Sequence, residues 1–414
     1  MSIDRRITLS NWLAPPYNRI AFQRVRELCP TALISRSPQP QFLPVDPVTL
    51  DDVTFAAADG STVRWADHLE RTYCDAVCVV HNGRIVHERY LNDMTERTPH
   101  LLMSVSKSVC GATLGIAIGR GLLRADDLVT HIAPEFVGTS LDGATVQHVI
   151  DMTAGTEFLE DYDTYDTYDT YDTYDTYAGV DSDHSAIGAV HRAEPPLIEY
   201  ERHAGYRPLG DRTPIGTLGH FRTYGLQRPH GAWFSYRSPL TNIAARLVEV
   251  VNDVPYPAVV ARDLWGPLGQ EHDADIMLDP LGHPVVEGGM SCSLRDLARL
   301  ALAYLCDGDG VVPAAWVDDT RMGNDAVVAA FTANPESDAE SAAWSMYRNA
   351  FWVMQRGVTF SGLGIFGQYC WVDRATNTAI ARFSTYPSAT PAELSAETLR
   401  GFSAVATHLA ERHD

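Results

Sequence analysis

Lys107 is the only lysine in a chain of 414 residues with 31 arginines, and it follows Ser104 by three positions. Arginine keeps its proton in proteins, whereas the pKa of a lysine shifts readily when the ammonium is removed from water. Codon bias towards arginine would explain the 31 arginines but not the one lysine. The pair therefore predicts proton transfer, with Lys107 as the base for Ser104 and the serine oxygen as a nucleophile towards an acyl group. A serine three positions before a lysine also arises by chance, so partners are needed.

A helix from Ser104 to about Arg120 would position the pair. Residues three apart share one helix face, which brings the hydroxyl and the amine within hydrogen-bond reach. Most of this segment is apolar or small, so we expect a buried helix. Burial disfavours the ammonium form and makes Lys107 a base. The residues on which this expectation depends are Val105, Val109, Cys110, Gly111, Ala112, Leu114, Gly115, Ile116, Ala117, Ile118 and Gly119.

A third proton carrier is expected well after the serine. Tyr236 is the best candidate, because it precedes a predicted helix and is followed two residues later by the small polar Ser238. Tyr90 is followed by an asparagine at the same interval, but it lies before Ser104 in a predicted hairpin. As one of 18 tyrosines, Tyr236 could equally be an ordinary core or surface aromatic residue. We expect the positive charge of Lys107 to lower the pKa of Tyr236, so that the two groups titrate together.

The composition sets outer limits. With 45% hydrophobic residues and a mass of 45.6 kDa, the chain can bury a large core, and we expect two domains. The formal net charge of −21 argues against nucleic acid and anionic membranes as partners. The first residues lack the apolar segment of a signal peptide, and no segment approaches membrane-spanning length. We therefore expect a soluble cytoplasmic protein that acts on a small molecule.

The seven cysteines are odd in number and scattered, which is typical of reduced core thiols. Cys74 and Cys78 lack a second pair of ligands, so we expect no zinc site there. No cofactor and no metal ion are expected.

The apolar patterns predict an α+β protein. A β-hairpin is expected from Asp75 to Tyr90, with Asn82-Gly83 as the turn signal. Strands near both ends and helices between them predict a sheet domain with an inserted helical domain, divided as 1–135, 136–284 and 285–414. Ser291 or Ser293 would cap the helix that follows them. Further helices are expected at 145–152, 240–251, 256–264, 294–305 and 394–411, and strands at 350–354, 366–372 and 378–384.

The segment 153–233 is too long for a simple connection and is rich in Gly, Pro, charged and aromatic residues, so we expect a lid or binding loop. Within it, Tyr-Asp-Thr repeats five times from Tyr162 and ends on Tyr177. The period of three fits neither a strand nor a helix, which predicts an extended acidic loop. It is either a tolerated repeat expansion or an aromatic, anionic lid that attracts amine-bearing substrates. A calcium-binding segment is disfavoured, since the glycine and terminal glutamate of an EF-hand are missing.

Several ordered motifs resemble those of one family, the 6-aminohexanoate-dimer hydrolases, and more broadly the class C β-lactamase and carboxylesterase superfamily. They cover most of the chain. The motifs are Pro15-Pro-Tyr-Asn-Arg19, Met103-Ser-Val-Ser-Lys-Ser108, Asp151-Met-Thr153, Phe234-Ser-Tyr236, Gly288-Gly289 through Leu294-Arg-Asp-Leu-Ala-Arg299, and Gly362-Leu-Gly-Ile-Phe-Gly-Gln368.

The resemblance implies a penicillin-recognising fold, in which helices flank an antiparallel sheet and a helical domain is inserted. It also implies an acyl-enzyme mechanism on amides or esters, with Ser104 as nucleophile and Lys107 and Tyr236 as the proton-transfer pair. The backbone N–H groups of Ser104 and Ile365 would form the oxyanion hole. The residues expected to contact the substrate are Tyr162, Ser291 and Gly364.

Two departures from the lactamase pattern limit the reaction. Gly362-Leu363-Gly364 replaces the Lys-Thr-Gly segment whose lysine helps to hold the antibiotic carboxylate, and Ser238 replaces the asparagine of the tyrosine motif. We therefore expect an amidase or esterase rather than a penicillinase. An acyltransferase with the same three residues and a non-catalytic acyl-binding module are the alternatives, and the sequence leaves a homodimer open.

Overall fold

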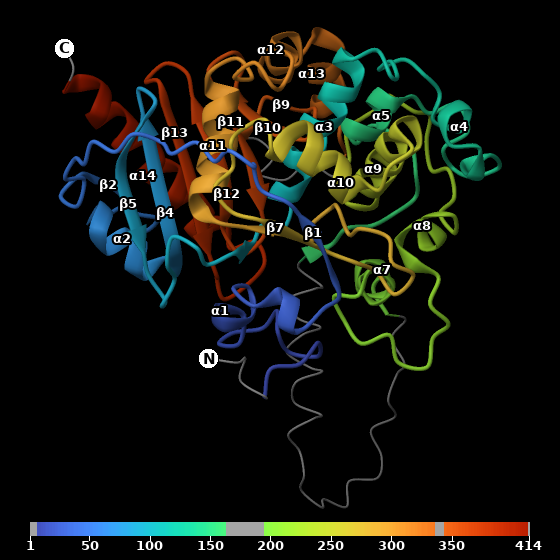
Figure 1. The fold of residues 1–414 in the computed structure, drawn as a ribbon, viewed down its shortest axis with the longest axis horizontal. Helices are drawn as coiled ribbons and strands as arrows, with labels where there is room; N and C mark the ends of the chain where they lie inside the picture. The colour runs from blue at the N-terminus through green and yellow to red at the C-terminus, as the bar shows by residue number, and fades with distance from the viewer. Residues whose placement is uncertain (1–5, 163–193, 336–342, 413–414) are drawn as a thin grey trace, which may run out of the picture.

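The computed structural model describes residues 6–162, 194–335 and 343–412, and its centre is an antiparallel sheet of seven strands in the order β5-β4-β13-β12-β11-β10-β9 (Figure 1). The hairpin β4–β5 from the first quarter of the chain thus lies beside the last strand. The strands are β4 (Cys74–His81), β5 (Arg84–Tyr90), β9 (Met346–Arg348), β10 (Phe351–Gln355), β11 (Thr359–Gly364), β12 (Gln368–Asp373) and β13 (Thr378–Ser384).

Strand β4 shows why the sheet is covered on both faces. All eight of its residues are buried. Successive side chains of a strand point to opposite faces of the sheet, so both faces must be covered by other elements. Val77 and Val79 pack with α2 (Trp65–Arg71) and α14 (Ala392–Glu411). Cys78 and Val80 pack into the larger core that contains α3 (Val105–Gly119) and α11 (Leu294–Leu305). The helix that carries Ser104 and Lys107 is therefore held directly against the sheet.

The middle of the chain forms a mainly helical part beside the sheet (Figure 1). Its longest helix, α9 (Pro239–Asn252), packs on α3 and follows the Tyr236 segment directly. The other helices are α4 (Val129–Ile132), α5 (Val146–Ile150), α7 (Pro196–Ala204), α8 (Gly216–Phe221) and α10 (Tyr256–Val260), which continues into a π-helical turn (Ala261–Trp265). Two further helices, α12 (Ala314–Met322) and α13 (Asp325–Thr332), pack near β9.

A second sheet of four short strands joins the two parts in the order β1-β7-β8-β6. It pairs β1 (Thr31–Ile34) with β7 (Ala274–Met277), and β8 (Met290–Cys292) with β6 (His100–Leu101). β7 belongs to the segment that we expected to be helical. The remaining small elements are α1 (Asn18–Ala21), a 3-10 turn (Val25–Glu27), β2 (Thr54–Ala56), β3 (Thr62–Arg64) and a second 3-10 turn (Pro134–Phe136).

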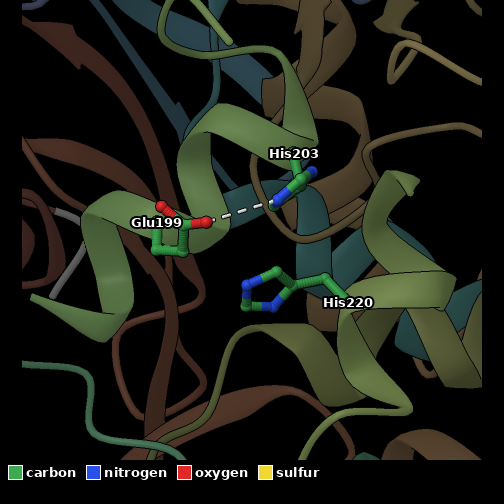
Figure 2. A group of neighbouring side chains, drawn as sticks. All are labelled: Glu199, His203 and His220. Carbon is green, nitrogen blue, oxygen red and sulfur yellow. Dashed lines mark ion pairs between the residues drawn. The ribbon is translucent and has the colours of Figure 1, made fainter. Parts of the chain in front are cut away.

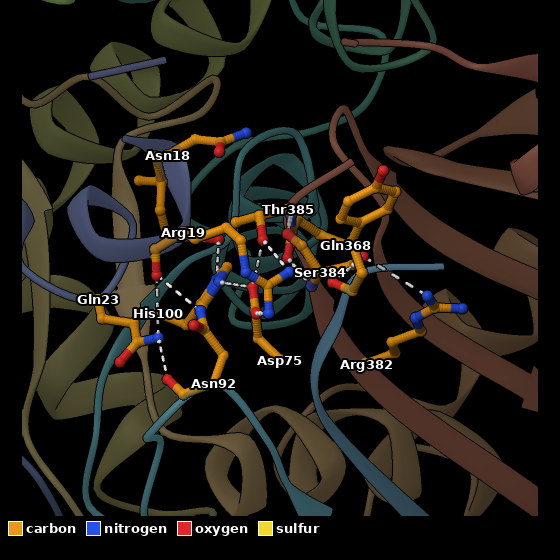
Figure 3. Close-up of polar contacts among 12 residues, drawn as sticks. Asn18, Arg19, Gln23, Asp75, Asn92, His100, Gln368, Arg382, Ser384 and Thr385 are labelled. Carbon is orange, nitrogen blue, oxygen red and sulfur yellow. Dashed lines mark hydrogen bonds and ion pairs between the residues drawn. The ribbon is translucent and has the colours of Figure 1, made fainter. Parts of the chain in front are cut away.

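The N-terminal motif is tied to the sheet by a buried polar network (Figure 3). Asp75 on β4 forms ion pairs with Arg19 and His100, both at 3.2 Å, and accepts a hydrogen bond from Thr385 at 2.9 Å. Asn18 donates to the backbone oxygen of Tyr386 at 3.1 Å. Buried polar groups need such partners, so the Pro15–Arg19 motif serves to attach the N-terminal segment just behind the serine helix.

Most predicted elements are confirmed, including the hairpin, the serine helix, the helices at 240–251, 294–305 and 394–411, and the last strand. Ser293 caps α11 by accepting from the N–H of Asp296. The prediction of a strand from 366 was wrong at its start: Phe366 has a left-handed backbone (φ 62°), and β12 begins at Gln368. The Tyr-Asp-Thr repeat beyond Tyr162 lies outside the described residues. None of the helices in the described ranges combines the length and the hydropathy that a membrane-spanning segment needs.

Candidate active site

Ser104 lies at the N-terminal end of α3, where the free N–H groups of the helix begin. The residue before it, Met103, has a left-handed backbone with φ 46°, which is uncommon for a side chain of this size. Such backbone strain is tolerated where the surrounding structure enforces it. Met103 is buried in the core cluster that also contains Phe22 and Phe366. Packing therefore turns the chain sharply into the helix and presents the serine hydroxyl to a cavity.

Lys107 lies one helical turn later, as the spacing predicts. Its Nζ is 2.7 Å from Oγ of Ser104 and donates to the backbone oxygen of Glu287 at 2.6 Å. The side chain is buried, with 1% of its surface exposed. Burial lowers the pKa of Lys107 to about 8, although the carboxylates of Glu160 and Glu287 oppose this shift. At mildly alkaline pH the neutral amine is therefore available to take the proton of Ser104.

Tyr236 reaches the same point from the segment before α9. Its ring lies 5.1 Å from Nζ of Lys107, stacks on Trp352 at 5.5 Å and meets Tyr347 edge-on at 5.8 Å. Our expectation of a lowered tyrosine pKa was wrong. Burial and the charge of Glu160 raise the pKa of Tyr236 well above its usual range, and these effects outweigh a hydrogen bond to Ser104. Tyr236 is thus a protonated phenol that can donate, and Lys107 is the better base.

The Asp151-Met-Thr motif holds the Tyr236 segment in place. Met152, with φ 55°, accepts a hydrogen bond from the N–H of Ser235 at its carbonyl oxygen (3.0 Å). Asp151 is buried; it forms an ion pair with Arg348 and accepts from the N–H of Asn349 at 2.9 Å. The motif thereby connects the tyrosine segment to the strands at the far edge of the sheet.

Ile365 lies in the turn between β11 and β12 and lines the site together with Ser104. In the described part of the chain, no hydrogen-bond partner is found for the N–H of Ile365 or of Ser104. A Cβ atom on Gly364 would lie 2.6 Å from the backbone oxygen of Leu102, closer than real Cβ contacts. Only glycine therefore lets the end of β11 approach the start of the serine helix, which brings the two N–H groups to one cavity.

The cavity in front of Ser104 has a volume of about 400 Å³. Aromatic side chains form one part of the lining, the aromatic wall, and Glu160 and Asp161 add two carboxylates next to Tyr162. None of the described residues that line it is an arginine, a lysine or a histidine. Its electrostatic character is therefore acidic and apolar. The aromatic residues are Phe158, Phe234, Tyr236, Trp344, Trp352 and Tyr369.

Sequence reasoning missed two acidic residues of this site. Glu160 accepts hydrogen bonds from the backbone N–H and the hydroxyl of Ser238, both at 2.5 Å, and from the Tyr162 hydroxyl at 2.6 Å. Glu287 is buried beside Lys107, and burial raises the pKa of its carboxyl to about 7. In the sequence, only their positions could have pointed to these two residues: Glu160 is two residues before Tyr162, and Glu287 directly precedes Gly288-Gly289.

Six of the seven predicted site residues meet at this cavity or at the adjoining one, namely Ser104, Lys107, Tyr162, Tyr236, Gly364 and Ile365. Ser291 does not. Side chains alternate along β8, and Met290 and Cys292 pack in the core that contains the serine helix. Ser291 therefore faces the other side, where it lines a second cavity with Arg24 and Arg97 and not the cavity in front of Ser104. The cluster with the residue types for a metal ion lies elsewhere, on α7 and α8.

Comparisons with known proteins agree with this geometry. The β-lactamase family model matches residues 64–403. The 6-aminohexanoate-dimer hydrolase of Paenarthrobacter ureafaciens is 31% identical over 387 residues, which cover 92% of this chain and 88% of that protein.

Solved structures share the fold. A candidate 6-aminohexanoate-dimer hydrolase from Bacillus anthracis superposes with a TM-score of 0.83 and 21% identity over 99% of both chains. EstCE1, a hydrolase with promiscuous acyltransferase activity, gives a TM-score of 0.58 and 16% identity over 83% of this chain and 98% of its own. With the family model and the 31% identical relative, these matches establish that the chain belongs to the β-lactamase family of serine hydrolases.

Proposed function

We propose that this protein hydrolyses small amide or ester substrates that carry an amine, through an acyl-enzyme on Ser104. The observation that carries the proposal is the combination of the Ser104–Lys107 contact with a cavity that has carboxylates and aromatic rings but no basic side chain among its described lining residues. The P. ureafaciens relative is named as the hydrolase of an amino-acid dimer, which supports action on small amides.

The mechanism follows from the protonation states. The neutral amine of Lys107 donates one N–H to the Glu287 carbonyl, and its lone pair then faces the Ser104 hydroxyl. Ser104 loses its proton to this amine and attacks the substrate carbonyl. The N–H groups of Ser104 and Ile365 hold the developing oxyanion, assisted by the N-terminal end of α3. The Tyr236 phenol passes a proton to the leaving amine or alcohol and regains one from the Lys107 ammonium; water then cleaves the acyl-enzyme, which releases the acid and restores the Ser104 hydroxyl.

The charges of the side chains that line the cavity indicate which class of substrate it binds. A carboxylate on the substrate would find no cationic partner among the described lining residues, whereas an ammonium group would lie near Glu160 and Asp161. Both carboxylates are partly buried, so salt is expected to weaken the preference only in part. The aromatic wall suits an unbranched methylene chain between the amine and the reacting carbonyl.

Three p-nitrophenyl esters of equal length test this proposal. One ends in an amine, one in an acetylated amine and one in a carboxylate. We expect kcat/KM to be highest for the amine and lowest for the carboxylate. Glu160→Gln should reduce the advantage of the amine over the acetylated ester by about tenfold, because it removes one charge near the cavity. A variant at the remote ion pair of Glu135 and Arg246, Glu135→Gln, serves as control. Preference for the carboxylate ester would contradict the proposal.

Acyl transfer is the second candidate, and the aromatic wall of the cavity favours it, since such a wall can shield the acyl-enzyme from water. EstCE1 has the same fold and is described as having this second activity. Adding an amine or alcohol acceptor to the reaction and quantifying both products separates the two reactions. Transfer product in excess of acid at moderate acceptor concentration would favour the transferase.

All seven cysteines are free thiols, which supports our further proposal that the protein works in the cytoplasm.

A further inference from the structure

Three side chains with metal-binding atoms converge between α7 and α8 (Figure 2). Glu199 and His203 are four residues apart on α7, so they share one face of that helix. His220 approaches them from α8. One ligand atom from each residue lies within 4.8 Å of the others. Within the ranges that the structure describes, this is the one group of at least three His, Cys, Asp or Glu residues with that geometry.

The hydrogen bonds around the cluster leave one atom of each residue facing its centre. Nδ1 of His220 is bonded to the Tyr224 hydroxyl at 2.8 Å, which leaves Nε2 for the cluster. Oε2 of Glu199 accepts from Arg212 at 2.9 Å, so Oε1 remains, 3.4 Å from Nε2 of His203. A partner that fixes the outer nitrogen of a histidine is the usual support for a metal ligand. Figure 2 shows the three side chains pointing toward one another.

His203 is the observation that points to a ligand. It is 4% exposed, and its Nε2, on the side of the cluster, has only the 3.4 Å contact with Glu199, which is longer than a normal hydrogen bond. Its outer Nδ1 has no hydrogen-bond partner, so His203 lacks the support that Tyr224 gives His220. A buried imidazole normally has at least one good partner. A metal ion bound at Nε2 would supply one.

The donor types select the class of ion. Two imidazoles and one carboxylate are a zinc-type set, with three protein ligands and a fourth position for water. Hard cations such as Mg²⁺ prefer oxygen ligands and fit this set poorly.

We propose that Glu199, His203 and His220 bind one zinc-type divalent ion that ties α7 to α8. The site is absent from our sequence expectations, which considered metal binding only at Cys74 and Cys78 and in the Tyr-Asp-Thr repeat. It is separate from the hydrolytic groups and does not depend on the proposed reaction.

A metal ion at this site would also affect the active site, because hydrogen bonds connect α7 to the segment that holds Lys107. Tyr200, next to Glu199, accepts a hydrogen bond from Asn242 at 2.6 Å. Asn242 in turn accepts from the N–H groups of Val286 (2.8 Å) and Glu287 (3.3 Å), and the Glu287 carbonyl is the acceptor for Lys107. An ion that fixes α7 therefore also fixes the segment that orients the catalytic lysine.

Metal content is the direct test. The full chain is stripped with a chelator, dialysed against buffered micromolar free Zn²⁺ and analysed for bound zinc, with Co²⁺ absorption as a probe of ligand geometry. We expect one zinc ion per chain and a tetrahedral Co²⁺ spectrum, both lost in His203→Asn and His220→Gln. Glu199→Gln, at a partly exposed position that tolerates change, should weaken zinc binding by at least tenfold. Zinc should raise the unfolding midpoint of the unaltered protein by about 5 °C at a hundredfold excess over Kd.

The pair His148 and His230 provides a matched control, because its rings lie 5.9 Å apart without a third metal-binding residue in the group. His230→Gln should keep the full zinc content. Failure of the unaltered chain to take up zinc would overturn the proposal. So would equal zinc content in the chain and in all three cluster variants, since the ion would then be bound elsewhere. A thiolate band in the Co²⁺ spectrum would likewise reassign the ion to the exposed Cys306.

Discussion

The backbone oxygen of Glu287 lies 2.6 Å from Nζ of Lys107, and the same nitrogen lies 2.7 Å from Oγ of Ser104. The carbonyl thus fixes the direction of the lysine amine, while the buried carboxyl of the same residue influences its charge. One residue therefore controls both the geometry and the basicity of the proposed base.

The pH profile of kcat/KM should rise through about pH 8, where Lys107 loses its proton, without a fall from Tyr236 at higher pH. Glu287→Gln removes a charge that raises the pKa of Lys107, so the rising limb should move to lower pH. A profile that is unchanged or moves to higher pH would contradict this role, and Glu135→Gln is the control. The unfolded chain retains the lysine proton up to about pH 10.5, so the contribution of Lys107 to the free energy of unfolding should rise with pH between about 8 and 10.5.

Lys107→Arg should lower kcat by at least a thousandfold, because a guanidinium keeps its proton and needs more space. The measurement is single-turnover acylation with a chromogenic ester. Rates near those of the unaltered enzyme would show that only the positive charge matters. Amine-directed reagents offer a complementary readout, since they can modify only Lys107 and the chain's amino terminus.

Ser104→Ala should abolish labelling by a fluorophosphonate and leave the unfolding midpoint nearly unchanged, because a single hydroxyl is removed and little volume changes. Mass spectrometry of the labelled peptide gives the site. Labelling that persists at Ser106 or Ser108 would assign the nucleophile to one of those neighbours.

Gly364→Ala should lower kcat by about a hundredfold with a smaller effect on KM, since a methyl group 2.6 Å from the Leu102 carbonyl forces Ile365 away from Ser104 and weakens the oxyanion hole. Gly60→Ala, whose methyl group meets open space but whose left-handed backbone (φ 79°) disfavours alanine, is the control for a substitution that costs stability away from the site. An unchanged kcat would place the second oxyanion donor elsewhere.

Asp151→Asn should lower the free energy of unfolding by about 3 kcal/mol, because it leaves the buried Arg348 with one carboxylate partner fewer. Asp126→Asn removes an exposed partner of Arg124 and should change stability by less than about 0.5 kcal/mol. Denaturant unfolding of both variants provides the comparison. Equal effects would show that the Asp151 pair is not structurally important.

Elements with strong local signals were predictable. The Asn82-Gly83 turn and the apolar serine helix have the predicted boundaries within two residues. The four-stranded sheet was not predicted, because its strands have two to four residues and are defined by pairing between distant segments such as β1 and β7. Helices α7 and α8 were missed because glycine, proline and charge around them outweighed their short apolar patterns.

Within the site, the sequence predicted which residues take part. It did not predict which distant residues surround them or how those neighbours shift their pKa values. Ser104 and Lys107 are one turn apart, so helix geometry sufficed. The raised pKa of Tyr236 depends on Glu160, which is 76 positions earlier in the sequence and is brought close only by folding. Likewise, His220 joins His203 only because α8 packs on α7.

Because β4 pairs with β13, the order of synthesis exposes the chain to a specific hazard. The partner for the apolar open edge of the β4–β5 hairpin is made only after nearly 300 further residues, since His81 pairs with Thr378. Until Thr378–Ser384 emerges, that edge can pair with other nascent chains. We therefore expect the yield of native protein to depend strongly on elongation rate and chaperone supply, and truncation before β13 to give aggregates rather than a smaller folded unit.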